Sequence, residues 1–472
     1  MNDHWPIWLL ITIVAALAGC AAHPLHDQGW VIPRPVAARF DAYRSPTDPP
    51  DESASPPAFN EPTGAVTLRD ALSAALLNNP QLESFSWEVR VREARTLQAR
   101  LWPNPEAGVG VENIAGSGAF SGVDSAETTV LLSQLIPLGG KIRKQTRVAE
   151  IERDLAGWDY EAARIAVVTE VVRALVQVDA TQRRVNLAMK NLELAEQVYD
   201  AAAKRVKAGA AVLLERTRAG VVVETSRIAL QRAERRLMSV RHRLAATWGS
   251  TTPAFEKVAA NLDAIAAVPP LEVLENHVTA NPDLARWTAQ VSQRQAAVEL
   301  ARAQAVPDLT AGVGARRFEE SDDTAAVVEF SLPLPLFDRN QGDVLESRFA
   351  LAKARADRRA AEVRVSVALA TTYQELAAAH AEAQSLRDNV LPAAQEAFDA
   401  TNQSYQQGKR GYLEVLDAQR SLFEARGQYI NALAGYHSAV AEVEGLIGQG
   451  LDEFRAKQNH DKDGNETKGH TE

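Results

Sequence analysis

The chain has 472 residues and a formal net charge of −10 at pH 7, with acidic and basic residues interspersed along its length. This balance excludes non-specific binding to nucleic acid, which depends on an excess of lysine and arginine that neutralises phosphates. Cys20 is the only cysteine, so the sequence contains no disulfide framework and no CxxC metal or redox pair.

The N-terminal segment predicts export and lipidation. Residues 7–18, IWLLITIVAALA, form an apolar run that is too short for a comfortable membrane span and lies where the hydrophobic region of a signal peptide belongs. The run ends in Leu-Ala-Gly-Cys, which resembles a bacterial lipobox. We therefore predict a lipoprotein signal peptide over residues 1–19, and diacylation of Cys20 as the mature N-terminus. The alternatives are an ordinary signal peptide and a buried apolar start. The first residues, MNDHW, depart from the lipoprotein pattern because they contain no lysine or arginine.

Two segments at the ends of the mature chain have no helical or strand pattern. Residues 20–64 contain many prolines and few periodic apolar positions, which predicts an extended leader that needs no packed core. Residues 451–472 are mostly polar and predict a disordered tail.

The chain between these segments is duplicated. The segment LRDALSAALLNNPQL, from Leu68, matches LEVLENHVTANPDL, from Leu271, and AGVG occurs once in each half. We predict a first repeat over residues 65–250, a linker over 251–269 and a second repeat over 270–450. Each repeat has the order helix, strand, loop, strand, long helix, turn, helix.

Four strands are predicted from alternation of apolar and polar residues. In PDLTAGVGARRF the apolar side chains fall on alternate positions, as they do in AAVVEFSLPL. Prolines stand at the ends of these runs, where they stop a helix without interrupting a strand ladder. The predicted strands cover residues 105–115, 127–137, 307–317 and 325–335.

The longest helices are predicted on either side of two glycine turns. No proline occurs from Lys141 to Arg205, and a helix of that length would extend on the order of 100 Å, typical of coiled-coil packing. The equivalent segment of the second repeat contains Pro392, which is expected to kink or break it. Gly209 and Gly408 would reverse the chain in the left-handed conformation that glycine adopts easily.

Four strands with one apolar face cannot close by themselves. The smallest bacterial membrane barrels need about eight strands, and an open sheet edge in hydrocarbon would leave unpaired amides. If the strands face lipid, the protomers must share one barrel. Two chains would supply eight strands and three would supply twelve, and composition does not choose between them.

Two similar segments contain the glycine turns, VKAGAAVLLERTRAGV from Val206 and YQQGKRGYLEVLDAQRSL from Tyr405. Together with the NPxL helix openings, the pattern YxxGxRxxxExLDAxxxL resembles the TolC family of outer-membrane efflux factors over residues 66–450. LSQLIPLGGKIRKQ is similar to the CzcC-like branch, which serves cobalt, zinc, cadmium or copper export.

The resemblance implies a mainly α fold with a small β part: long helical hairpins that build a periplasmic α-barrel, and four strands contributed to a trimeric outer-membrane β-barrel. It implies a homotrimer that is lipid-anchored in the outer membrane and extends into the periplasm. The implied partners are outer-membrane lipid, a periplasmic adaptor (membrane fusion) protein and an inner-membrane pump of the resistance-nodulation-division class.

The resemblance also implies roles for residues near the two turns. The family pattern predicts hairpin tips that dock the adaptor and a periplasmic gate in which carboxylates face the constriction. Three copies of such a carboxylate near one axis would repel one another, raise one another's pKa and attract cations. The family commonly has aspartate where Glu414 stands, and the first hairpin has no tyrosine at the position equivalent to Tyr405. The alternative for the acidic residues is a solvated helix start. The gate residues are Tyr405, Arg410, Glu414, Asp417 and Glu215, and the tip residues are Gly209, Gly408, Lys409 and Gly411.

The sequence contains no catalytic constellation. Its histidines are scattered without an HExxH or cysteine partner, so we predict no metal site, no cofactor and no enzymatic activity. Only three methionines occur, so no methionine relay for copper(I) is present. The expected function is a passive exit duct for divalent heavy-metal cations. A duct for organic drugs or for type I protein secretion, and a periplasmic coiled-coil scaffold, are the alternatives.

Overall fold

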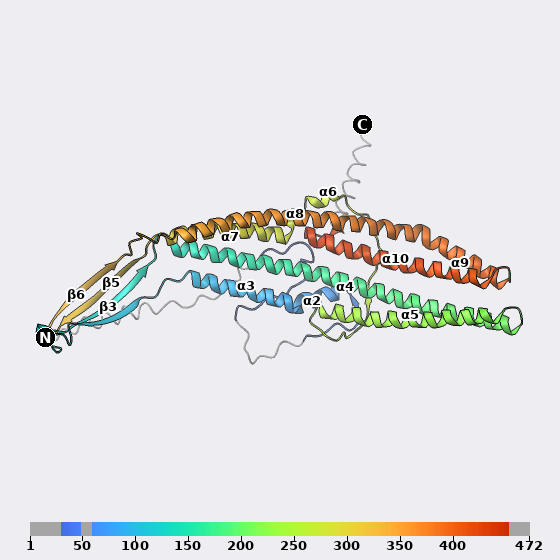
Figure 1. Ribbon diagram of the computed structural model, residues 1–472, viewed down its shortest axis with the longest axis horizontal. Coiled ribbons are helices and arrows are strands. Elements are labelled where there is room, and N and C mark those ends of the chain that lie inside the picture. Colours follow the sequence, from blue (N-terminus) through green and yellow to red (C-terminus); the bar gives the residue numbers. More distant parts are fainter. Residues whose placement is uncertain (1–29, 49–58, 453–472) are drawn as a thin grey trace, which may run out of the picture.

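A computed structural model describes residues 30–48 and 59–452 of the chain. The predicted signal peptide and Cys20 lie outside the described residues, as does most of the predicted tail. The molecule is elongated, with a four-stranded sheet at one end and the turns of two long helical hairpins at the other (Figure 1). The mainly helical fold with a small β part is thereby confirmed.

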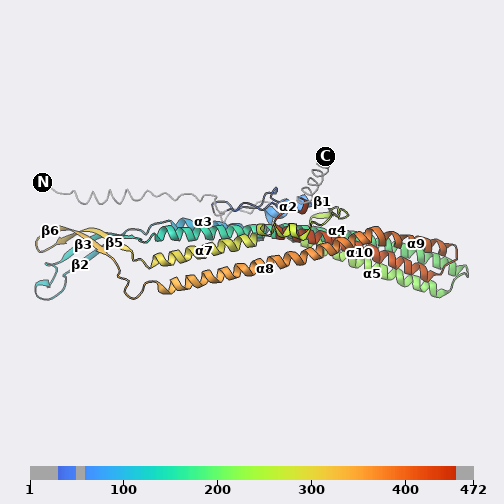
Figure 2. The ribbon, with the colours of Figure 1, turned by 90° about the horizontal axis from the view of Figure 1, so that it is seen from above.

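The helices follow the duplication of the sequence. In Figure 2, α7 lies between α4 and α8, and the contacts give the lateral order α3, α4, α7, α8 near the sheet and α5, α4, α10, α9 near the turns. The helices of the first half are α2 (Leu68–Asn78), α3 (Pro80–Ala99), α4 (Lys141–Lys207) and α5 (Leu213–Ala246), and those of the second half are α6 (Leu271–Glu275), α7 (Pro282–Gln304), α8 (Gln341–Ser385), α9 (Leu391–Gln406) and α10 (Tyr412–Ile447).

The repeated Asn-Pro pair has the same structural task in both halves. Asn79 caps α3 by accepting a hydrogen bond from the backbone N–H of Leu82 at 3.0 Å, and its amide donates to the carbonyl of Thr247 at 2.8 Å. Asn281 caps α7, and its amide donates to the carbonyl of Leu446 at 2.8 Å. Each asparagine therefore satisfies a helix start and ties it to the C-terminal end of a helix in its own repeat.

The large sheet is antiparallel, with the order β2–β3–β5–β6. Its register places Val109, Val130, Ala315 and Ala326 in one row across the four strands. The neighbouring row, on the opposite face, contains Gly110, Thr129, Arg316 and Ala325. One face is thus apolar and the other mixed polar, as the alternation predicted. The strands are β2 (Glu106–Glu112), β3 (Glu127–Ile136), β5 (Leu309–Phe318) and β6 (Asp323–Ser331).

A second, smaller sheet was not predicted. Strand β1 (Gly64–Thr67) pairs in parallel with β4 (Phe255–Ala259), which lies in the segment expected to be only a linker. Val66 and Phe255 are buried against α4 and α5 in the core near the middle of the molecule. The pair joins the start of the first repeat to the segment that leads into the second.

The leader differs from the prediction of an extended segment without a packed core. Val36 and Ser45 are buried, and the Val36 N–H donates to the carbonyl of Gly448 at 3.2 Å. The Arg164 guanidinium on α4 reaches the leader, donating to the carbonyl of Val36 at 3.0 Å. Charged side chains on the helices satisfy backbone groups that a proline-rich segment cannot pair within itself.

The long helix of the second repeat is interrupted before Pro392, where a kink or break was expected. Residues Leu386–Val390 form a π-helical turn, and α9 follows from Leu391. The proline has no N–H to donate, and the wider turn moves the chain past its ring. In α4 no such turn occurs over 67 residues.

Candidate functional site at the ends of the hairpins

The two hairpin turns have the same local geometry. Gly209 has φ +69° and Gly408 has φ +73°, and open space surrounds the position that a Cβ would occupy at each. The Ala210 N–H donates to the carbonyl of Arg205, and the Lys409 N–H donates to that of Ser404, both at 2.9 Å. The left-handed backbone conformation alone therefore explains the two glycines. The turns that they allow bring backbone N–H groups to carbonyls in the last turns of α4 and α9.

Predicted gate residues of the second hairpin lie at the start of α10. The Glu414 carboxylate accepts a hydrogen bond from the Gly411 N–H at 3.3 Å and forms an ion pair with Arg410 in the same protomer. The hydrogen bond from Arg410 and that from the Gly411 backbone lower the pKa of Glu414. Asp417 pairs with Arg420 at 2.8 Å, and both side chains are exposed. Within one protomer both acids form ion pairs with arginines of the same hairpin, in the first turns of α10.

A tyrosine cluster fills the space between the two hairpins. The rings of Tyr405 and Tyr412 lie 6.3 Å apart, and the Arg205 guanidinium stacks 4.9 Å from the centre of the Tyr405 ring. Both tyrosines are buried in a small core with Val198, Ala219 and other apolar residues.

Three polar atoms in this cluster are buried without a hydrogen-bond partner in the described part of the chain. They are the hydroxyl oxygens of Tyr405 and Tyr412 and one carboxylate oxygen of Glu215 on α5. Burial raises the pKa of Tyr412 to about 12, and the nearby charges of Tyr405 and Glu215 contribute in the same direction. Leaving such groups unpaired is costly, so each of them would gain from a further polar partner.

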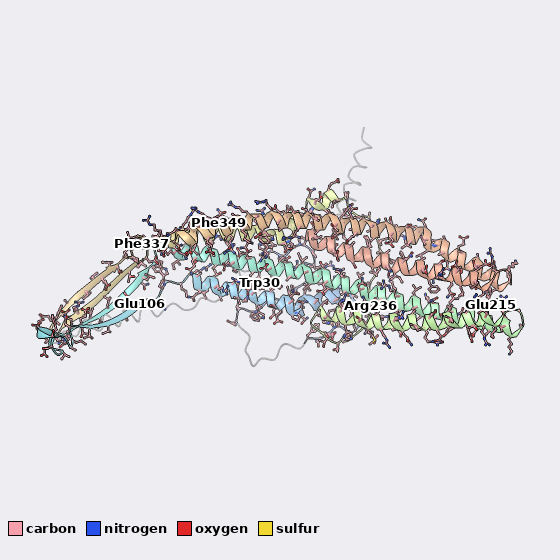
Figure 3. The ribbon with its side chains drawn as sticks, in the orientation of Figure 1. Trp30, Glu106, Glu215, Arg236, Phe337 and Phe349 are labelled. Carbon is pink, nitrogen blue, oxygen red and sulfur yellow. The ribbon has the colours of Figure 1, made fainter. Side chains whose placement is uncertain are left out.

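The structure thus divides the predicted gate residues into two sets. Tyr405 and Glu215 lie inside the protomer between its hairpins, whereas Arg410, Glu414 and Asp417 lie on its exposed surface. Figure 3 shows Glu215 at the far end from the sheet. Tyr412 was missed by the sequence analysis, although it stands one heptad after Tyr405 and directly after the glycine turn.

The described residues also constrain the chemistry. They contain no group of three or more histidine, cysteine, aspartate or glutamate side chains that could hold a metal ion. None of the described helices is both long and apolar enough to cross a bilayer.

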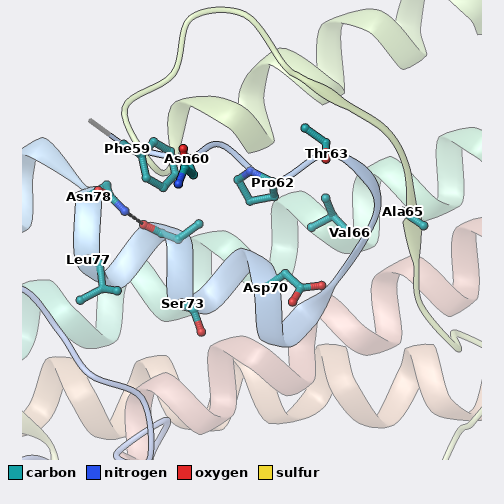
Figure 4. A pocket seen from close by; sticks show the side chains of 11 residues that line it. Phe59, Asn60, Pro62, Thr63, Ala65, Val66, Asp70, Ser73, Leu77 and Asn78 are labelled. Atoms are coloured by element: carbon teal, nitrogen blue, oxygen red, sulfur yellow. Dashed lines mark hydrogen bonds between the residues drawn. The ribbon is translucent and has the colours of Figure 1, made fainter. Parts of the chain in front are cut away.

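A surface pocket beside α2, shown in Figure 4, offers no second chemical site. Its lining includes Phe59, Pro62 and Leu77, and Asp70 is its one carboxylate. The Asp70 carboxylate accepts a hydrogen bond from the Thr67 N–H at 3.0 Å, which caps the start of α2. Hydrogen bonds from the Thr67 side chain and backbone lower the pKa of Asp70, so this acid has a structural role.

Comparison with known proteins gives a consistent result. The model of a family described as outer membrane efflux protein matches residues 71–250 and 273–449. The cobalt-zinc-cadmium resistance protein CzcC of Cupriavidus metallidurans is 34% identical over 394 residues, which cover 83% of this chain and 93% of CzcC. The nickel-cobalt-cadmium resistance protein NccC of Alcaligenes xylosoxydans xylosoxydans is 27% identical over 64% of this chain and 67% of its own length. The crystal structure of the outer membrane protein VceC from Vibrio cholerae superposes with a TM-score of 0.69 at 20% identity, covering 81% of this chain and 96% of VceC.

Proposed function

Since the chain belongs to the outer membrane efflux protein family, we propose that three copies form an outer-membrane exit duct for divalent heavy-metal cations. The duct works passively in a tripartite system, with a periplasmic adaptor and an inner-membrane pump of the resistance-nodulation-division class. The observation that carries the metal assignment is the 34% identity to CzcC across 93% of that protein.

The open flanks of the protomer support assembly into a ring. The first flank consists of β2, α3 and α5, and the second flank of β6, α8 and α9, because these elements end the lateral order at each level. Strands β2 and β6 each have one unpaired edge. Copies that join first flank to second flank would satisfy these edges and leave no free one.

The first part of α8 has an exposed apolar face that also fits a neighbouring copy. Phe349, Val363 and Val367 are each more than half exposed, and all lie on the side of α8 turned away from α7 and α10. Val91 is exposed on α3, which the same closure would bring opposite α8. Figure 3 places Phe349 near the sheet end of the molecule. Exposure of so many large apolar side chains to water is unfavourable, which is typical of a surface that contacts a partner.

The two faces of the sheet support its placement in a barrel wall. The apolar face contains Val109, Val313 and Val328, which would meet lipid, and the polar face contains Glu106 and Glu329. Alternation of lipid-facing and lumen-facing residues is the pattern of membrane strands. Acylation of Cys20, which the lipobox predicts, would add an anchor in the same membrane.

The decisive experiment is metal and drug sensitivity of a deletion strain. We expect sensitivity to zinc, cobalt or cadmium salts, restored by the intact gene, and unchanged tolerance of dyes and antibiotics. Lost drug tolerance with normal metal tolerance would retain the duct and overturn the substrate assignment. Release of the protein from cells without detergent would favour the periplasmic scaffold instead.

Two further tests address the predicted residues. Substitution of Cys20 by serine is expected to abolish incorporation of labelled palmitate, and normal incorporation would refute the lipobox. The double substitution of Glu414 and Asp417 by glutamine and asparagine is expected to reduce metal tolerance while leaving the amount of assembled protein unchanged, because it removes the carboxylates of the predicted constriction.

A further inference from the structure

Helix α5 has an unusual charge, since its 34 residues contain eight arginines and three glutamates. Its buried side chains, among them Ala219, Val223 and Leu244, face α4. Arg232, Arg236 and Arg243 are spaced by four and seven residues, so they share one stripe on the side turned away from that contact. All three are exposed, and none forms an ion pair within the described part of the chain.

The protomer adds further positive charge near this stripe rather than balancing it. Burial lowers the pKa of Arg184 on α4, and repulsion from Arg236 lowers it further. Figure 3 shows Arg236 on α5 nearer to the middle of the molecule than Glu215, away from the predicted gate. An exposed arginine stripe with a like-charged neighbour is complementary to carboxylates presented by another molecule.

The second flank has carboxylates that are equally unpaired. Glu375 and Glu382 on α8 are seven residues apart, exposed, and without an ion pair in the described residues. The buried side chains of this part of α8, Leu369, Leu376 and Ala383, face the rest of the protomer. The two glutamates therefore stand at the margin of the open flank, as the arginines do on α5.

The heights of the two stripes match. Helix α5 begins, and α9 ends, beside the two glycine turns, which lie at the same end of the molecule (Figure 1). At the same rise per residue, Arg236 lies about as far from its turn as Glu382 does, and Arg243 about as far as Glu375.

The two stripes also lie on the same side of the seam between copies. Helices α5 and α8 run in opposite directions and stand at opposite flanks of the protomer. Viewed from the N-terminus of each helix, the charged stripe is reached from the buried face by turning about the helix axis in the same direction. With opposite helix directions and opposite flanks, these displacements point to one side of the shared seam.

We propose that Arg236 and Arg243 of one copy form ion pairs with Glu382 and Glu375 of the next copy. These pairs fix how neighbouring copies are aligned along the long axis of the molecule. The inference rests on the proposed function, because it requires a ring in which first flank meets second flank. It assigns residues of this chain to that contact, between the hairpin turns and the sheet and separate from the predicted gate. Charge pairs suit this task because they discriminate against displaced registers more than they add affinity.

Cross-linking of the purified full-length protein in detergent tests the contact. The chain with Arg236→Cys and Glu382→Cys, treated with a short bismaleimide, is expected to give covalent dimers and trimers on a denaturing gel. The control combines Glu234→Cys with Glu382→Cys, because Glu234 is exposed on α5 close to Arg236 in sequence but on another side of the helix. The control is expected to remain monomeric on the gel.

Charge reversal provides the second test. Arg243→Glu is expected to lower the trimer fraction at low salt several-fold, and the added Glu375→Arg to restore it. Cross-linking equal to that of the control, or no effect of the reversal, in a protein that remains trimeric would overturn the inference and leave the proposed function standing. A wild-type chain that is monomeric in detergent and after cross-linking in membranes would overturn both. Capture of the adaptor at Arg236 in place of a second copy would assign the stripe to another partner and overturn the inference.

Discussion

The docking of the leader on α4 depends on a buried ion pair. The side chains of Glu161 and Arg164 are only 2% and 3% exposed, and they pair at 2.8 Å. Arg164 also donates to the carbonyls of Val36 at 3.0 Å and Arg34 at 3.1 Å, and the Arg34 N–H donates to the Glu161 carboxylate at 2.6 Å. Both members of the pair therefore bind backbone groups of the leader.

Arg164→Met removes one member and leaves Glu161 as a buried, unpaired charge, which costs about 3–5 kcal/mol. At about 1.4 kcal/mol per factor of ten, the leader should detach about 10²–10⁴ times more often. The Val36 amide, which is bonded to the carbonyl of Gly448, reports this detachment by hydrogen exchange. We expect its exchange to accelerate by that factor while amides in the middle of α4 stay protected.

A matched control is Arg173→Met on the same helix. Arg173 pairs with Glu442 at 2.8 Å, but the two side chains are 53% and 30% exposed, so about 0–1 kcal/mol is at stake. Val36 should exchange there as in the wild type. Replacing both buried charges by Glu161→Leu and Arg164→Met should recover part of the protection. Unchanged exchange in Arg164→Met would refute the reasoning and show that apolar contacts hold the leader.

Two further predictions concern the sheet and the tyrosine cluster. A Cβ at Gly314 would lie 2.1 Å from the carbonyl oxygen of Val130, whereas one at Gly108 would meet nothing within 4 Å. Gly314→Ala should therefore lower stability by about 1–3 kcal/mol in thermal unfolding, and equal melting of Gly314→Ala and Gly108→Ala would contradict it. The Tyr412 pKa is raised to about 12 in the folded chain, so the stabilisation present below pH 10 is lost as the pH rises through 12. Phenolate absorbance should rise and the free energy of unfolding should fall over this pH range. In Tyr412→Phe, this pH-dependent fall in stability should be absent. If Tyr412→Phe loses stability over the same range as the wild type, ionisation of buried Tyr412 is not the cause.

Sequence reasoning reached the helices and strands because each has a regular period over many residues. In the second repeat the strand faces followed from alternation, and the register of β5 with β6 agrees with them. The first repeat's ETTVLLSQLIPL is more uniformly apolar, so alternation did not fix its facing. The β1–β4 pair was missed because each strand has only four or five residues and its partner is far away in the chain. The buried leader was missed for a related reason, since Arg164 compensates its polar backbone from a helix that the local pattern does not indicate.

The predicted gate was only partly accessible to the same reasoning. The resemblance to the TolC family, carried by the pattern around Gly408, singled out Tyr405, Arg410 and Glu414. Spacing does not distinguish a partner in the same helix from one in a neighbouring hairpin, and in the protomer Arg410 pairs with Glu414. The burial of Tyr412 depends on how two hairpins pack, which no local pattern encodes.

If three copies close the ring, the unbroken helix α8 connects the level of the sheet to the level of the charged stripes. Helix α8 starts at Gln341, soon after β6, and extends without interruption to Ser385, so the second flank of the sheet and of the helical wall belongs to one rigid segment. A slip of one residue between strands would invert their faces, and a slip between helices would separate the charges on α5 and α8. Only one register satisfies both levels. The π-helical turn at residues 386–390 follows that segment on the side of the hairpin turns, between Ser385 and Tyr405. The one wider turn in this long helix therefore lies outside the straight segment that spans both levels.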